Sequence, residues 1–390
     1  MVRPLQAFFQ LEAASGVLLL GAAAAALVWA NSSAVDAYRS TLAYPFVLGA
    51  GTLGVRFTVL DLVNDGLMTL FFFVVGMEIK RELAHGELRT LARAMLPAVA
   101  ALGGMVVPAV LFLAFNPGTP GRAGWAIPMA TDIAFSIGCL TLLKSRVPYG
   151  LIVFLTALAI FDDIGGILVI AAFYGHGIHW AWLAAAGALT GAVTALGRGG
   201  MRNGLFYVAA GVALWSLLHQ AGIHATLAGV ALGLAVPASE DAEAPLERFI
   251  HLLHPYVAFL VMPLFALANA GVSLRGSGLD ALLGPVAVGA GVGLFLGKTI
   301  GVFSFTWAAV TFGWAPMPAG ASAAKLLGVS MVAGIGFTVA LFIAALAYAE
   351  RPELLAQAKV GILAGSLLSG LAGMGLLRLT PEVRTDLAES

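Results

Sequence analysis

Four ionisable side chains lie well inside apolar segments of this sequence, namely Asp132, Asp162, Asp163 and Lys298. A charged side chain at the centre of a membrane-spanning helix costs on the order of 3 kcal/mol, so four without partners would cost roughly 10 kcal/mol. That cost is comparable to the stability of a whole domain. A chain retains such residues only where they pair, contact water, or move ions and protons.

Asp162 and Asp163 are adjacent in the segment TALAIFDDIGGILVI, residues 156–170, and give the strongest of these signals. Neighbouring residues on a helix point about 100° apart, so the two carboxylates form a broad polar sector on an apolar helix. Carboxylates this close titrate in coupled steps. Such a pair could hold protons near neutral pH and release them when a cation arrives. The alternative is a structural pair that interacts only with helix dipoles or with Lys298.

Asp132 follows Thr131 in WAIPMATDIAFSIG, residues 125–138. Pro128 has no amide proton and disfavours helix at the residue before it, so we predict an interrupted helix. Interrupted backbone at membrane depth is tolerated beside a cavity or inside protein. Asp132 could then offset a positive helix end, and the Thr131 hydroxyl could serve as a neutral ion ligand. A simple kink with a capped acid is the alternative.

Lys298 lies in FLGKTIG, residues 295–301. A buried lysine loses its charge unless a carboxylate lies nearby, which favours an ion pair with Asp162 or Asp163. The alternative is a side chain that extends to the membrane surface.

These residues require elements that cross a membrane, and the composition provides them. Of the 390 residues, 60% are hydrophobic and 10% charged, whereas soluble domains contain roughly 25% charged residues. We predict an all-α polytopic membrane protein, a single integral membrane domain over residues 1–390 with about twelve transmembrane helices. The expected spans are residues 12–30, 59–79, 95–115, 121–143, 150–174, 181–197, 203–219, 222–237, 249–272, 283–310, 326–348 and 357–378.

The basic residues predict the orientation. With the N-terminus inside, the cytoplasmic loops hold most of the Lys and Arg residues, so both termini are expected to be cytoplasmic. Because so many spans follow, we expect residues 12–30 to be an uncleaved helix and not a signal peptide. The formal charge of zero and the lack of basic runs indicate no nucleic-acid partner.

Three shorter segments add detail. The acidic stretch SEDAEAPLER, residues 239–248, is expected to be a solvated loop. Residues 46–57 are rich in glycine and β-branched residues, which fits either a β-hairpin outside the membrane or an irregular loop. GIGF, residues 334–337, is weak evidence by itself, since glycines often mark close packing. Together with the Pro128 break it is typical of crossed discontinuous helices, a design known from secondary transporters.

Charged residues also border the second and ninth spans. A solvated membrane rim and a pH-sensitive gate are equally compatible with them, because histidine titrates near physiological pH. His224, in GIHATLAG, is expected to be a hydrogen-bonded packing residue. The rim residues are Asp65, Glu78, Lys80, Arg81, Glu82, His251 and His254.

At these positions the sequence closely resembles the NhaA family of bacterial sodium/proton antiporters, from the first span to the last. The matching motifs occur in order: FFFVVGMEIKREL (71–83), ATDIAFSIG (130–138), ALAIFDDIGGI (157–167), GIHATLAG (222–229), LHPYVAFLVMPLFALANAGV (253–272), GKTIG (297–301) and GIGFT (334–338).

The resemblance implies a fold and an assembly. Residues 95–174 and 283–378 would form inverted repeats around the ion site, with the fourth and eleventh helices discontinuous. Residues 12–79 and 181–272 would supply scaffold and dimer-interface helices. The protein would be a homodimer in the bacterial inner membrane, joined partly by the hairpin.

It also implies roles for individual residues. By the match of FDD, Asp163 would be the main sodium ligand and Asp162 the proton-linked partner of Lys298. By the match of ATD, Thr131 and Asp132 would line the helix crossing, with Thr131 a further sodium ligand. The residues expected in a pH-sensing or entry funnel are Asp65, Glu78, Glu82, Glu247, His251 and His254.

One position departs from the family pattern. Ile250 stands where family members carry a glutamate used in the pH response, and Glu247, about one turn earlier, could substitute for it. The pH dependence of this protein therefore does not follow from the resemblance.

The function expected is a pH-regulated, electrogenic Na⁺(Li⁺)/H⁺ antiporter that works by alternating access and controls intracellular pH and sodium. It would be no enzyme and need no cofactor. A symporter or an exchanger of another substrate is the nearest alternative, but Asn and Gln are scarce in the spans. An intramembrane aspartyl protease would place its aspartates on separate helices and carry GxGD, which is absent. A passive channel would conduct without coupling.

Overall fold

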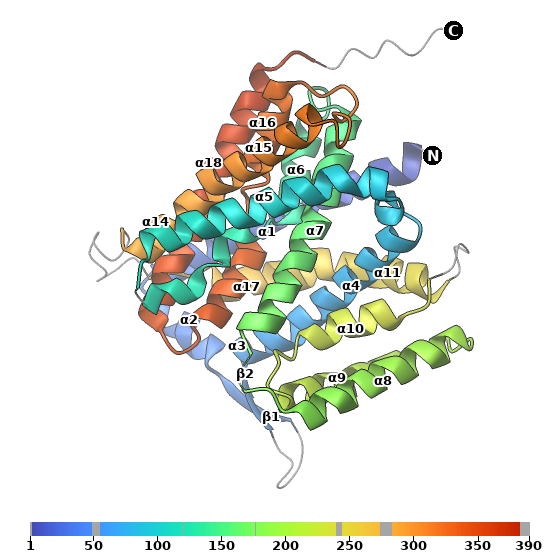
Figure 1. Ribbon diagram of the computed structural model, residues 1–390. Coiled ribbons are helices and arrows are strands. Elements are labelled where there is room, and N and C mark those ends of the chain that lie inside the picture. Colours follow the sequence, from blue (N-terminus) through green and yellow to red (C-terminus); the bar gives the residue numbers. More distant parts are fainter. Residues whose placement is uncertain are drawn as a thin grey trace. The chain divides into compact units, whose positions relative to one another are not determined.

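The computed structural model describes residues 2–48, 55–118, 120–175, 177–238, 244–273 and 283–382 (Figure 1). These residues are mostly helical, and their contacts divide the chain into two compact units. The first unit comprises residues 1–20, 90–166 and 274–390, and the second comprises residues 21–89 and 167–273. The unit boundaries fall inside two long helices, α1 (Val2–Ala30) and α7 (Tyr149–Phe173).

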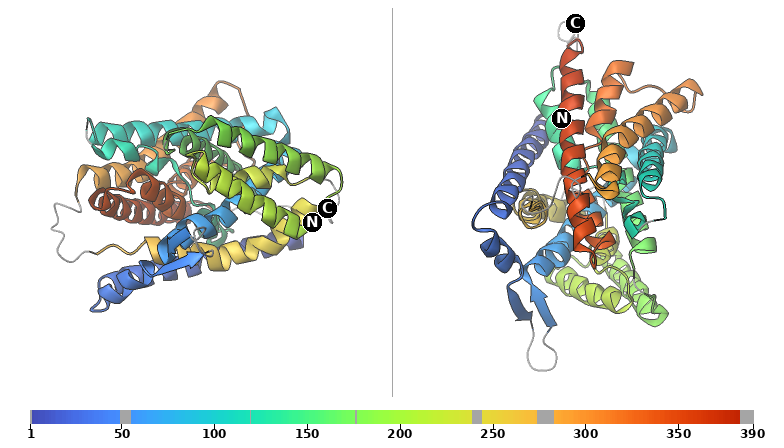
Figure 2. Two further views of the ribbon diagram at one scale, coloured as in Figure 1. Left: turned by 90° about the horizontal axis from the view of Figure 1, so that it is seen from below. Right: turned by 90° about the vertical axis from the view of Figure 1, so that its left-hand side faces the viewer.

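The first unit contains most of the interrupted helices. Its long helix α18 packs against α14, α16 and α17 (Figure 2). Besides parts of α1 and α7, the unit consists of α5 (Leu91–Phe115), the 3-10 turns η4 (Pro120–Gly124) and η5 (Ile127–Met129), α6 (Ile133–Leu142), α14 (Pro285–Val292), the π-helical η7 (Gly293–Gly297), α15 (Lys298–Thr311), α16 (Ala323–Val332), α17 (Phe337–Ala347) and α18 (Pro352–Leu379).

Helices α5 and α15 are in close contact near Lys298, the first residue of α15. A Cβ atom on Gly103 would collide with the carbonyl of Gly301, and one on Gly301 would collide with the carbonyl of Gly103. Small residues allow such backbone approach between helices in a membrane. A Cβ on the next residue, Gly104, would lie 3.4 Å from Cδ of Lys298. Glycines on α5 therefore leave room for the aliphatic part of this lysine.

The second unit contains the hairpin and the remaining helices. Helices α8 and α9 contact each other along their length (Figure 1). The elements are α2 (Val35–Leu42), β1 (Pro45–Leu48), β2 (Val55–Thr58), α3 (Val59–Asp61), the π-helical η2 (Leu62–Leu67), α4 (Met68–Ala84), the 3-10 turn η3 (Glu87–Arg89), α8 (Trp180–Arg198), α9 (Gly204–Gln220), α10 (Leu227–Ala235), α11 (Pro245–Tyr256), the π-helical η6 (Val257–Val261) and α12 (Met262–Asn269).

Of the two structures expected for residues 46–57, a β-hairpin and an irregular loop, the hairpin is confirmed. Strands β1 and β2 pair antiparallel, with Phe46 opposite Phe57, and their rings stack with centroids 6.2 Å apart. The glycine-rich residues 49–54 between the strands lie outside the described part of the chain. Thr58 then forms a capping box with Asp61, which begins the next helix directly after the strand.

Helices α4 and α10 pack through glycine as closely as α5 and α15 do. A Cβ on Gly76 would lie 2.8 Å from the carbonyl oxygen of Val230. At the end of this contact the Lys80 ammonium donates to the carbonyl oxygens of Leu234 and Val236, which close α10. A cation at a helix C-terminus satisfies carbonyls that have no partner within the helix. This lysine therefore has a structural role that the sequence did not indicate.

Seven described helices are long and apolar enough to cross a membrane, or up to ten if each bent pair counts as one span. Helices lie in all twelve predicted segments, but α9 has 17 residues and α10 has nine. A bilayer requires about 20 residues of helix. Twelve crossings therefore remain a prediction.

The acidic stretch 239–248 differs in part from the expected loop. Residues 239–243 lie outside the described part of the chain. Helix α11 begins at Pro245, so Glu247 and Arg248 belong to its first turn. Proline at the first helical position and an acid beside the helix N-terminus both favour this earlier start.

Candidate functional site

The predicted interruption at Pro128 is present in the first unit. The turn η5 ends at Met129, Ala130 is extended with a ψ of 148°, and α6 begins at Ile133 after a bend of 43°. Asp132 occupies the N-cap position, where its Oδ1 atom accepts a hydrogen bond of 3.1 Å from the amide of Phe135. The acid therefore satisfies the helix end that the break exposes.

The second predicted interruption lies between α16 and α17, where the helices bend by 45° at residues 333–336. This second break contacts the first through Asp132. The amide of Asp132 donates to the carbonyl of Ile335 at 2.6 Å, and Oδ2 of Asp132 accepts from the amide and the hydroxyl of Thr338 at 3.2 and 2.5 Å. One buried carboxylate thus caps both α6 and α17. Two helix N-termini together offset about one negative charge.

Lys298 forms a buried ion pair with Asp162. Its Nζ atom lies 2.6 Å from Oδ2 of Asp162, and neither side chain has any exposed surface. The same ammonium donates to the carbonyl of Met129, the last residue before the first break. Loss of either charged partner would leave the other charge buried without compensation, which is costly. The ion pair expected from the sequence is confirmed, and Asp162 is the partner.

Thr131 joins this pair to the second break. Its hydroxyl oxygen lies 2.7 Å from Oδ2 of Asp162 and 2.8 Å from the carbonyl oxygen of Ala333. A hydroxyl has one proton and can also accept, so Thr131 donates to one of these oxygens at a time. The Oδ1 atom of Asp162 has no hydrogen-bond partner among the described residues. A buried carboxylate oxygen thus lies next to a hydroxyl that can change its hydrogen-bond partner.

Asp163 adds the third carboxylate of the cluster. It follows Asp162 on α7, is 8% exposed, and interacts electrostatically with Lys298. With all four groups ionised, the cluster of Asp132, Asp162, Asp163 and Lys298 would have a formal net charge of −2, about one unit of which the two helix N-termini at Asp132 offset. Such a cluster attracts cations and protons, and the oxygen atoms of carboxylates, hydroxyls and carbonyls suit hard cations. Among the described residues, no group of three or more His, Cys, Asp or Glu side chains forms a metal site.

The residues predicted for a funnel all lie in the second unit, in two separate places. Near the end of α4, Nδ1 of His254 lies 3.1 Å from Oε1 of Glu78, and Arg81 lies within 4.0 Å of both Glu82 and Glu247. His251 is exposed on the same helix as His254. Asp65 precedes Glu78 by thirteen residues, about 20 Å along a helix.

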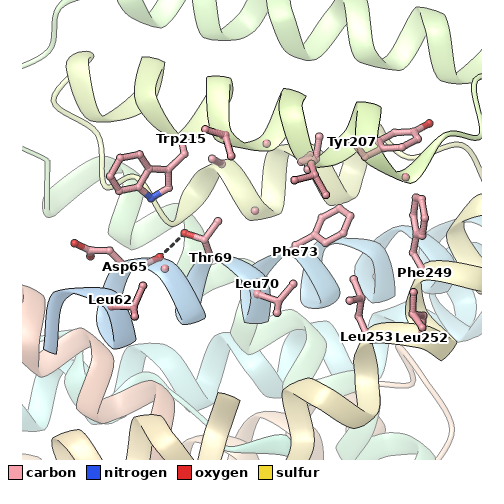
Figure 3. A pocket seen from close by; sticks show the side chains of 18 of the residues that line it. Leu62, Asp65, Thr69, Leu70, Phe73, Tyr207, Trp215, Phe249, Leu252 and Leu253 are labelled. Atoms are coloured by element: carbon pink, nitrogen blue, oxygen red, sulfur yellow. Dashed lines mark hydrogen bonds between the residues drawn. The ribbon is translucent and has the colours of Figure 1, made fainter. Parts of the chain in front are cut away.

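Asp65 has different partners from the rest of that set. Its Oδ1 atom lies 3.7 Å from Nε2 of His224, and Nδ1 of His224 contacts the hydroxyl of Thr226 at 2.7 Å. The hydrogen-bonded role expected for His224 is confirmed. Asp65 also borders an apolar cavity of about 620 Å³, lined by aromatic and aliphatic side chains of α4, α9 and α11 that include Phe73, Trp215 and Phe249 (Figure 3). The structure therefore separates Asp65 from the Glu78 group.

Comparison with known proteins identifies the family of this chain. A sequence profile of the family described as Na⁺/H⁺ antiporter 1 matches residues 6–377. The chain belongs to the NhaA family of Na⁺/H⁺ antiporters. Curated NhaA relatives include one from Anaeromyxobacter sp. that is 57% identical over 98% of this chain and 93% of the relative. Another, from Myxococcus xanthus, is 54% identical over 97% and 93%, and one from Rhodospirillum rubrum is 49% identical over 97% and 98%.

For this NhaA member, reasoning from the sequence found the charged residues of the cluster but missed the groups that hold them. Thr338, Ser136 and Ser366 were not singled out, although all three bond to the breaks. Thr338 follows GIGF directly, so a hydroxyl in the first turn after a break was an available signal. The backbone carbonyl of Met129 accepts a hydrogen bond from Lys298, and no residue type in the sequence predicts this contact.

Proposed function

We propose that this protein is a secondary transporter that exports Na⁺, or Li⁺, from the cell in exchange for protons. The observation that carries the proposal is the buried ion pair of Asp162 and Lys298, next to Asp163 and the two helix breaks. Relatives named Na⁺/H⁺ antiporters, 49–57% identical over nearly the whole chain, support the ions assigned here. By removing sodium and admitting protons, the protein would control intracellular pH and sodium.

Competition for one site would couple the two ions. Na⁺ would bind the Asp163 carboxylate, with Oδ1 of Asp162 and the Thr131 hydroxyl as further oxygen ligands. A cation at this position would repel the Lys298 ammonium, so the ion pair must break or lose a proton as sodium arrives. When sodium leaves, protons would return to the carboxylates and to the lysine. Either Asp162 itself or Lys298 would carry the second proton.

The helix breaks would make this exchange possible without a large penalty. Asp132 is already bonded to both helix N-termini, so its charge is offset by fixed dipoles. Thr131 already contacts a carbonyl at the end of α16, which keeps an oxygen donor beside Asp162. We infer that the broken helices cross at this point and that the site faces one side of the membrane at a time. NhaA is among the proteins from which this rule of crossed, discontinuous helices is drawn.

The exchange is proposed to be electrogenic. Two protons, one on Asp163 and one on either Asp162 or Lys298, would be replaced by a single Na⁺. One extra charge moved per cycle draws about 2.3 kcal/mol from each 100 mV of membrane potential. That energy sustains a sodium gradient of roughly fifty-fold.

The surrounding architecture is proposed to follow the family. Residues 95–174 and 283–378 would be inverted repeats, and each contains one of the three bent helix pairs. Twelve spans would place both termini in the cytoplasm of a bacterial inner-membrane protein. Residues 12–79 and 181–272 would supply scaffold and dimer-interface helices, with the hairpin as part of the interface.

Regulation by pH is proposed to involve the second unit. Glu78, Glu82, Glu247, His251 and His254 lie on α4 and α11, and the Glu78–His254 pair supports this assignment because the charge of histidine changes near neutral pH. Asp65, which pairs with His224, would act separately from this group.

Reconstituted vesicles test the proposal directly. A pulse of NaCl or LiCl outside vesicles of wild-type protein should move protons, reported by a pH-sensitive dye, while a choline chloride pulse should not. Asp163→Asn should abolish the response. A membrane potential imposed across the vesicles should change the rate of sodium-dependent proton movement by the wild-type protein. Full sodium-dependent proton movement in Asp163→Asn would overturn the assignment of the site. Sodium and protons moving in the same direction would overturn antiport.

A further inference from the structure

Most described Ser and Thr side chains inside helices bond back to the carbonyl four residues earlier. This local bond satisfies the hydroxyl without any tertiary partner. The residues that do so are Thr41, Thr69, Thr141, Thr156, Thr190, Thr194, Ser216, Thr299, Ser304, Thr306, Thr311 and Ser330.

Three helical serines of the first unit do not follow this pattern, and all three lie at the break between α16 and α17. Ser136 donates to the carbonyl of Val332 at 3.2 Å. Ser366 on α18 accepts from the amide of Phe337 at 3.2 Å, at the first residue of α17. Ser369 is one turn further along α18. The side of α18 that carries Ser366 and Ser369 therefore supplies hydroxyl groups to this break.

Ser369 differs from the other two because its hydroxyl is unused. The side chain has 0% exposure, and Oγ has no hydrogen-bond partner among the described residues. It lies beside Gly334, where a Cβ atom would be 2.6 Å from Oγ of Ser369 and 3.1 Å from the carbonyl oxygen of Met331, and would collide with the carbonyl oxygen of Leu294. Oγ of Ser369 and the carbonyl oxygens of Met331 and Leu294 thus all lie close to Gly334, and the hydroxyl bonds to neither carbonyl.

We propose that Ser369 is a positioning residue for ion exchange, whose hydroxyl donates to the carbonyl of Met331 or Leu294 after the break changes shape. The inference rests on the proposed antiport function. A buried hydroxyl without a partner disfavours the described conformation, so a conformation that satisfies it gains population. Leu294 lies in η7, which ends directly before Lys298. A bond to Leu294 would therefore link the break to the helix that holds the buried lysine.

The test compares exchange with stability in Ser369→Ala. This variant loses no bond of the described conformation, so its unfolding temperature in detergent should not fall. Its maximal exchange rate in vesicles should fall about five-fold, the effect of one hydrogen bond on the balance of two conformations. Sodium binding by the purified protein should keep its wild-type affinity at each pH. Ser369→Cys, whose thiol is a weaker donor, should give an intermediate rate.

Two matched variants provide the controls. Ser366→Ala removes the hydrogen bond to the amide of Phe337 and should lower the unfolding temperature. Ser330→Ala removes only a bond within its own helix and should change neither the unfolding temperature nor the exchange rate much. Wild-type exchange by Ser369→Ala at every pH would overturn the inference while leaving antiport intact. A rate loss matched by a fall in stability like that of Ser366→Ala would also overturn it. A wild-type protein that exchanges no ions would refute the proposed function and this inference together.

Discussion

In the first unit the side chains of Lys298 and Asp162 have no exposed surface, whereas in the second unit those of Glu78 and His254 keep 21% and 20% of theirs. The difference decides what each pair can do. A fully buried pair cannot be screened by salt, so a change in one charge must be answered by the other or by an ion. A partly exposed pair is weakened by water and salt and responds mainly to the pH of the solution. The proposed ion exchange therefore fits the first unit, and the proposed regulation by pH fits the second.

The largest effect expected from this contrast is that of Lys298→Met. Methionine keeps much of the side-chain volume but leaves Asp162 buried without its cation, which should lower the free energy of unfolding by about 3–5 kcal/mol. Titration with a denaturing detergent would measure it. The double variant Lys298→Met with Asp162→Asn should recover most of the loss. If it is no more stable than the single variant, the pair is not what holds these helices together.

A smaller effect is expected for Asp132→Ala, because Asp132 caps α6 and α17 at once. Each lost cap typically costs about 1–2 kcal/mol, so the two together should cost about 2–4 kcal/mol in the same measurement. Asp132→Asn keeps one acceptor oxygen and should lose less. Equal losses for alanine and asparagine would show that the charge, and not the caps, stabilises the two breaks.

The smallest effect is expected for Glu78→Gln in the second unit. Exposed and half-exposed ion pairs contribute about 0–1 kcal/mol, so stability should change by less than about 1 kcal/mol. Any change should shrink further at high salt. The pH dependence of exchange is the readout that should move instead. A loss of stability as large as that of Lys298→Met would remove the distinction between the two units.

The parts of this molecule that could be predicted from sequence are those set by local chemistry. Pro128 and the GIGF segment together indicated the two interruptions, and the bends in the structure lie at these residues. Asp132, Asp162, Asp163 and Lys298 stood out because charges are rare in apolar helices.

The missed parts depend on contacts between distant residues. Asp132 and Thr338, which meet at the breaks, are 206 positions apart, and no pattern near either residue indicates the other. The residues alone likewise left open which aspartate pairs with Lys298, since adjacent acids differ only in what the fold brings opposite them. Only the family resemblance pointed to Asp162. The π-helical turn before Lys298 gave no periodic signal either, since one irregular turn does not alter the apolar composition.

The claim that one site serves both ions can be tested most directly by proton release on sodium binding. Purified protein in a weakly buffered detergent solution would be titrated with NaCl at several fixed pH values. The account predicts that each binding event releases protons and that the apparent Na⁺ affinity rises about tenfold per pH unit for each proton displaced. Asp163→Asn should bind no Na⁺ and release none. Sodium binding that releases no protons, with an affinity independent of pH, would contradict a shared site.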